Sequence, residues 1–230
     1  MNSEKIKRFA AIIRPFLDNS ESHIEEVRRI SKKQGSARDW PWNRFVHAFA
    51  SNGGSKHWDD KIKPNYKKYA WAAIESLSGH ERKKRLEYAT NPRRRTRNGE
   101  RWLSRSFEQV FQRVRKAGGP KAIKKEYNAI TKSEGRIAYW KQFPGIGDKY
   151  AREIPMRSYD PFFLKDRFAV DARLRRLLKI MFKKPVNYRC AELFFVAVAR
   201  ELKTECWILD TILYDNYLEI EAKLLKRHGH

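Results

Sequence analysis

Lys149 and Asp171 are the two residues of this chain whose types and positions best suit chemistry at a carbon centre. Lys149 follows a Pro-Gly-Ile-Gly turn in "FPGIGDKYAREI" (143–154), and Asp171 opens a helical segment in "FAVDARLRRLL" (168–178). A neutral lysine amine can attack an electrophilic carbon and form a Schiff base. A carboxylate held close to a reacting group can stabilise positive charge that develops on it. The two residues stand 22 positions apart, so two different helices must bring them together.

The turn before Lys149 has the composition of a phosphate-binding hairpin. Gly145 and Gly147 both permit positive φ and leave no Cβ atom to keep another chain away. Such a turn exposes backbone N–H groups at the start of the next helix, where the helix dipole favours an anion. We therefore predict that Gly145, Ile146 and Gly147 contact a phosphodiester, which fixes register without reading base sequence. An ordinary helix–helix turn is the alternative.

The charge of the chain points to the same class of ligand. Its 230 residues include 51 Lys and Arg against 27 Asp and Glu, a formal net charge of +24. A field of this sign concentrates polyanions and speeds their encounter, so nucleic acid is the predicted partner. Within the polar segment 91–101, Arg93, Arg94 and Arg95 follow one another. We predict that this loop lies near phosphates, with a solvated loop of no particular role as the alternative.

Composition argues against several other classes of protein. The apolar runs, such as 193–199, are too short to span a bilayer, so no membrane partner is expected. Cys190 and Cys206 are too few for a disulfide framework, a four-cysteine zinc site or an iron–sulfur cluster. The six histidines show no metal-ligand spacing. We expect an intracellular, DNA-associated protein, in the cytoplasm, nucleoid or nucleus, without a metal.

Apolar residues recur with helical spacing along most of the chain, and no sustained period-two alternation is found. The sequence therefore predicts an all-α fold. The predicted helices are 4–17, 22–33, 42–50, 66–78, 99–118, 120–130, 136–143, 171–182, 188–202 and 206–226.

Taken together, these segments resemble the helix-hairpin-helix (HhH-GPD) DNA glycosylase superfamily. The hairpin of that family usually reads Leu-Pro-Gly-Val-Gly-x-Lys-x-Ala, and this chain has Phe-Pro-Gly-Ile-Gly-Asp-Lys-Tyr-Ala at 143–151. The family's second signature, an apolar pair and then Asp at a helix start, is matched at 169–171. The spacing between the two is a few residues longer than usual. The resemblance is close over about 136–180 and extends elsewhere only by architecture.

The resemblance implies an enzyme that flips a damaged base out of the duplex and excises it. Asp171 would stabilise positive charge on the sugar, although it could instead be only a helix N-cap. Lys149 would attack the sugar C1′ and permit β-elimination, the AP lyase activity of lysine-bearing members. As a phosphate contact it would instead belong to a base-only glycosylase. 8-Oxoguanine is the first expected substrate, and oxidised pyrimidines are the second.

The same resemblance suggests further binding residues. Asn52, in "FASNGGS" (49–55), would fill the hole left by the extruded base, or else cap its helix. Arg173, where members often have His, would clamp a phosphate or pair with a neighbour. The hairpin carbonyls could hold a monovalent cation, as in relatives, and no other cofactor is implied. The cysteines of the endonuclease III-type cluster are absent, which indicates a cluster-free branch.

The resemblance also implies two helical lobes with the site in the cleft between them. The first lobe, 36–155, ends in the hairpin, and the second combines 1–35 with 156–230 and carries the aspartate. The expected partner is double-stranded DNA containing a damaged base or an abasic site, bound by a monomer. The alternative from another class is a non-enzymatic DNA-binding protein that kept the hairpin without the pocket.

Overall fold

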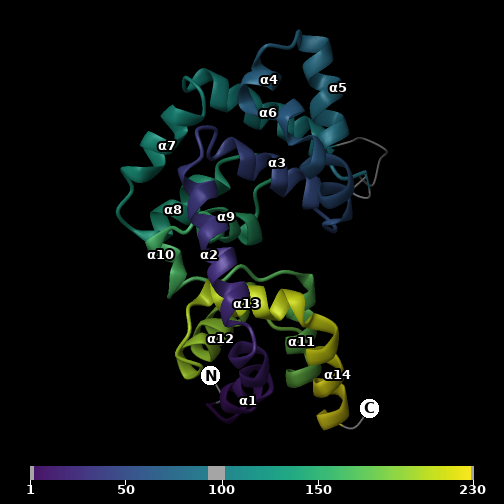
Figure 1. Cartoon of the computed structure of the whole chain (residues 1–230), viewed down its shortest axis with the longest axis vertical. Coiled ribbons are helices and arrows are strands. Elements are labelled where there is room, and N and C mark those ends of the chain that lie inside the picture. Colours follow the sequence, from purple (N-terminus) through teal and green to yellow (C-terminus); the bar gives the residue numbers. More distant parts are fainter. Residues whose placement is uncertain (1–2, 93–101, 229–230) are drawn as a thin grey trace. The chain divides into compact units, whose positions relative to one another are not determined.

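Every regular element of the computed structural model, which describes residues 3–92 and 102–228, is a helix (Figure 1). The predicted all-α class is confirmed for these residues. None of their helices is both long and apolar enough to cross a membrane. The elements are α1 (Ser3–Asp18), α2 (Glu21–Ser36), α3 (Trp42–Ser51), a π-helical turn η1 (Trp58–Ile62), a 3₁₀ segment η2 (Lys63–Lys68), α4 (Trp71–Glu75), α5 (Gly79–Ala89), α6 (Trp102–Lys116), α7 (Pro120–Asn128), α8 (Ser133–Lys141), α9 (Asp148–Met156), α10 (Pro161–Leu164), α11 (Ala172–Phe182), α12 (Tyr188–Glu201), α13 (Cys206–Asp215) and α14 (Tyr217–His228).

The chain divides into two compact units. Unit 1 consists of Met1–Gly35 and Pro155–His230, and unit 2 is the continuous segment Ser36–Ile154. Helix α9 begins in unit 2 and ends in unit 1. Unit 1 is therefore built from two segments that are far apart in the sequence.

An aromatic core holds unit 2 together around α3 and α6. Along α6 the buried side chains include Phe107 and Phe111, one turn apart on a single face. The Phe107 ring stacks on Trp42 and Phe49 of α3, with ring centroids 5.3 and 4.4 Å apart. This packing fixes the end of α3.

The core of unit 1 joins α1 to α12. Phe9 of α1 meets the edges of Phe194 and Phe195, at centroid distances of 5.7 and 5.9 Å. Phe168 stacks on Phe195 at 5.0 Å. Because Phe168 comes three residues before Asp171, this packing anchors the segment that leads into α11.

Two predicted helices are each interrupted in the structure. In 66–78 the 3₁₀ segment η2 ends before α4 begins, because Ala70 has the extended backbone (φ −57°, ψ 150°) of a helix N-cap. The predicted helix 206–226 is divided into α13 and α14 at Asn216, which has φ −108° and ψ 19°. In both places a local change of backbone conformation outweighs a continuous apolar pattern.

Helix α5 was missed by the sequence analysis because most of its residues are charged or polar. Its start carries a capping box, in which the Ser78 hydroxyl accepts from the Glu81 N–H and the Glu81 carboxylate accepts from the Ser78 N–H. The Ser-x-x-Glu spacing is a recognised signal of a helix start, so the sequence did contain the information needed to place α5.

Candidate active site

The hairpin consists of α8, α9 and the turn between them, and it is anchored by Phe143. This ring is 1% exposed, lies 4.8 Å from the Phe45 ring and has the Arg113 guanidinium 4.4 Å from its centroid. The Ile146 N–H donates to the Phe143 carbonyl at 3.0 Å, which closes the turn. Ile146 is buried and its N–H is engaged within the turn, so the phosphate contact expected of this residue stays a prediction.

The two glycines of the hairpin differ in backbone conformation and in the space around them. Gly145 has φ +82°, and a Cβ there would lie 2.9 Å from the Phe49 ring and 3.3 Å from the Ser106 Cβ. Gly147 does not use positive φ, and among the described residues, its two chain neighbours apart, no atom lies within 4 Å of a Cβ built on it. Its carbonyl accepts the first hydrogen bond of α9, from Ala151 at 3.0 Å. The fold therefore requires glycine at the first position and not at the second.

A matched pair of substitutions should separate these roles. We expect Gly145→Ser to lower the free energy of unfolding by about 1–3 kcal/mol, because it adds backbone strain and a clash. Gly147→Ser keeps a good N-cap residue, so unfolding should change by less than about 0.5 kcal/mol, whereas duplex affinity should fall. Urea unfolding and duplex titrations measure the two effects. Unchanged affinity of the Gly147 variant would contradict a phosphate contact at this backbone.

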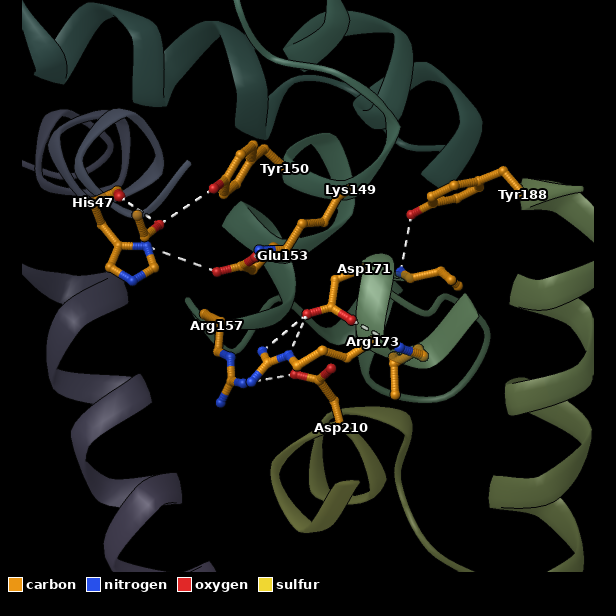
Figure 2. Close-up of polar contacts among 12 residues, drawn as sticks. His47, Lys149, Tyr150, Glu153, Arg157, Asp171, Arg173, Tyr188 and Asp210 are labelled. Atoms are coloured by element: carbon orange, nitrogen blue, oxygen red, sulfur yellow. Dashed lines mark hydrogen bonds and ion pairs between the residues drawn. The ribbon is translucent and has the colours of Figure 1, made fainter. Parts of the chain in front are cut away.

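Lys149 lies in the first turn of α9 and pairs with Glu153 one turn further along (Figure 2). Its Nζ atom is 2.9 Å from Glu153 Oε2, and Glu153 Oε1 lies 3.7 Å from Nδ1 of His47 on α3. The Lys149 side chain is 33% exposed and the Glu153 side chain 12%. A carboxylate at this distance stabilises the charged form of the amine. Glu153 was not among the site residues predicted from the sequence, although Lys and Glu at i and i+4 share one helix face.

Asp148, next to the lysine in sequence, has other partners. Its Oδ1 atom lies 3.0 Å from Lys141 Nζ and 3.3 Å from an Arg152 guanidinium nitrogen. Partial burial alone would raise the pKa of Asp148, but Lys141 and Arg152 outweigh it, and the pKa lies below its ordinary value. Asp148 is thus committed to two cations on α8 and α9.

Asn52 stands at the end of α3, with extended backbone (φ −64°, ψ 111°). The following Gly53 supplies the positive φ, at 90°. The Asn91 side chain donates to the Gly54 carbonyl at 3.0 Å, and its backbone N–H donates to the Phe49 carbonyl at 3.1 Å. Asn52 is therefore the C-cap of α3, which was one of its two predicted roles. Insertion of the Asn52 side chain into DNA stays a prediction.

Asp171 is the N-cap of α11 and is held at both carboxylate oxygens (Figure 2). Oδ1 accepts from the Leu174 N–H at 3.0 Å, and Oδ2 accepts from Arg173 Nε and Nη2 at 3.0 and 2.9 Å. The segment before it is fixed as well, because the Val170 N–H donates to the Tyr188 hydroxyl at 3.1 Å. Capping and an ionised carboxylate are compatible, so the observed cap leaves the proposed chemistry open.

Arg173 has the pairing role that the sequence analysis gave as one of two alternatives. Partial burial would lower the pKa of Arg173, but the Asp171 carboxylate outweighs it and raises the pKa above its ordinary value. The guanidinium carbon also lies 4.3 Å from the Tyr214 ring centroid. A phosphate contact by Arg173 stays a prediction.

Lys149 belongs to unit 2 and Asp171 to unit 1, and their convergence on one substrate stays a prediction. Arg93, Arg94 and Arg95 lie outside the described residues. Within 3–92 and 102–228, no three His, Cys, Asp or Glu side chains are grouped to hold a metal ion. The monovalent cation at the hairpin carbonyls likewise stays a prediction. No family model, curated protein or solved structure matches the chain.

Proposed function

We propose that this protein is a DNA glycosylase with AP lyase activity, with the two-lobed helix-hairpin-helix architecture of that superfamily. Gly147 is the observation that carries the proposal. Its α-carbon faces open space at the start of α9, two residues before Lys149. Ser or Asn would cap this helix at least as well, whereas the close approach of a phosphate to a helix N-terminus favours glycine.

Asp171 would act on the bond between sugar and base. As that bond breaks, positive charge develops on the deoxyribose, and a nearby fixed carboxylate stabilises it. The Leu174 N–H and the Arg173 guanidinium hold the carboxylate in one orientation. Because the group is already oriented, little reorganisation is needed at the moment of reaction.

Lys149 would supply the nucleophile. Its neutral amine forms a bond to C1′ as the bond to the base breaks, which yields a Schiff base after the sugar ring opens. Loss of a C2′ proton and departure of the 3′ phosphate then cut the strand by β-elimination. By the resemblance stated above, the substrates are oxidised bases, with 8-oxoguanine first and oxidised pyrimidines second.

A base-only glycosylase is the second candidate, and the Lys149–Glu153 ion pair favours it. A carboxylate 2.9 Å from the amine stabilises the protonated lysine, which cannot attack carbon. In that case Lys149 contacts a phosphate, and water completes the reaction at C1′.

A cleavage assay on a lesion panel tests both candidates. Each duplex carries one 8-oxoguanine, one oxidised pyrimidine or one abasic site, and the products are resolved before and after hot alkali. Strand breaks without alkali support the glycosylase with lyase activity. On the two lesion duplexes, breaks only after alkali support the base-only enzyme. Alkali cleaves the abasic duplex without any enzyme, so that duplex is read before alkali only. Tight binding to every duplex without enzyme-dependent breaks would reject both and leave the non-enzymatic DNA-binding protein.

Glu153→Gln should move the pH dependence of Schiff-base formation. Removing the carboxylate removes an opposite charge, so the amine becomes neutral at lower pH and the profile should move to lower pH. Borohydride trapping on an abasic duplex across a pH series measures it. Glu219→Gln is the matched control, because Glu219 pairs with Lys223 at the same 2.9 Å and i,i+4 spacing. An unmoved profile would mean that Glu153 does not govern protonation of Lys149.

A further inference from the structure

A basic groove in unit 2, formed by η1, η2 and α5, shares no residue with the hairpin. It is an open hollow of about 500 Å³. Its lining includes Lys61, Lys68, Tyr69, Lys84, Arg85 and Tyr88. Four of the nine residues that line the groove are Lys or Arg, against 51 of 230 in the whole chain. Such a surface attracts a polyanion.

The acidic side chain in the groove lining, Glu81, is already engaged. Its carboxylate accepts from the Ser78 N–H at 3.2 Å in the capping box of α5. The hydrogen bonds from Ser78 lower the pKa of Glu81. Among the residues that the structure describes, Lys61, Lys68 and Lys84 form no ion pair. With Arg85 they give the lining four positive charges against the one negative charge of Glu81.

Two tyrosines, Tyr69 and Tyr88, add aromatic rings to the lining of the groove. Tyr69 is buried at 4% exposure, with the Arg85 guanidinium 5.9 Å from its ring centroid. Tyr88 is 56% exposed, and its backbone carbonyl lies 2.9 Å from His57 Nε2. Lys84 and Tyr88 are one turn apart on α5 and share a face. An exposed aromatic ring beside lysines is the pairing with which proteins bind single strands, by base stacking and phosphate contacts.

We propose that this groove binds single-stranded nucleic acid. Phosphates contact Lys61, Lys68, Lys84 and Arg85, and one base stacks on the Tyr88 ring. A duplex cannot offer that base without unpairing it, so the groove prefers a single strand. The inference goes beyond the excision activity and does not depend on it, because the groove is independent of Lys149 and Asp171.

Fluorescence anisotropy with an undamaged single-stranded deoxyoligonucleotide, over a salt series, tests the lysines. The combined Gln variant of Lys61, Lys68 and Lys84 should reduce the slope of log affinity against log salt by about two, since each phosphate contact to a single strand contributes roughly 0.7. The matched control changes Lys63, Lys67 and Lys83, exposed lysines of η2 and α5 outside the lining. Equal losses in both variants would overturn the proposal.

Tyr88 provides the second arm of the experiment. Tyr88→Ala should lower affinity for the single strand roughly 5- to 150-fold, and Tyr88→Phe should retain it because the ring remains. The blunt duplex of the same sequence should respond much less to either change. Wild-type affinity of Tyr88→Ala, or equal competition by poly-glutamate of the same length, would overturn nucleic-acid stacking. Circular dichroism of each variant verifies that it is folded.

Discussion

Asp171→Asn should lower the rate of base removal by about 10²- to 10³-fold, or roughly 3–4 kcal/mol of transition-state stabilisation. The substitution removes the negative charge but keeps an oxygen that can cap α11, because Asn is as good an N-cap as Asp. Single-turnover excision on the duplex that the wild type cleaves best measures the effect. Thermal unfolding of the variant should stay close to that of the wild type.

Asp160→Asn is the matched control for that experiment. Asp160 is also an N-cap aspartate of unit 1, whose carboxylate accepts from the Phe162 N–H at 3.0 Å. Both variants lose one capping charge, and only the Asp171 variant is expected to lose activity. A reduction of less than about tenfold at Asp171, or about 1.4 kcal/mol in activation free energy, would mean that the charge is not used in the reaction and that this residue is a cap alone.

Lys149→Gln should abolish borohydride trapping on an abasic duplex. Gln has no amine that can form a Schiff base, so no covalent adduct can be reduced. Duplex affinity should fall only a few-fold, because one charge among many is lost. Denaturing gels of the trapped complex and anisotropy titrations measure the two quantities separately.

Lys141→Gln is the control for Lys149. Lys141 is an exposed lysine of α8 that also pairs with a carboxylate, Asp148, at 3.0 Å. Its replacement removes the same charge beside the same hairpin, and trapping should continue. Trapping that persists in Lys149→Gln would refute the lyase assignment. Loss of trapping in both variants would indicate a binding defect.

Local patterns in the sequence predicted much of the fold. Helix α6 is an example, because its apolar residues recur at the spacing of one buried face, and that face is buried in the structure. The cap of α11 is another, since Asp171 stands directly before a helical apolar pattern. Such features depend on residues within a few positions of one another.

Contacts between distant segments could not be predicted in this way. The close approach of the Phe49 ring to Gly145 depends on how α3 packs against the hairpin, so the roles of the two glycines could not be distinguished from the sequence alone. The contact between His47 and Glu153 also depends on tertiary packing, because α3 and α9 come together only in the folded unit. Tertiary packing decides these positions, and spacing along the chain does not report it.

The assembly of unit 1 from two distant segments has a consequence for biosynthesis. Phe9 is translated long before its partners Phe194 and Phe195. Unit 2 is continuous, so it can close while synthesis is still under way. Throughout that interval the apolar face of α1 has no native surface to cover it, so we expect nascent α1 to be a site of chaperone binding or of aggregation.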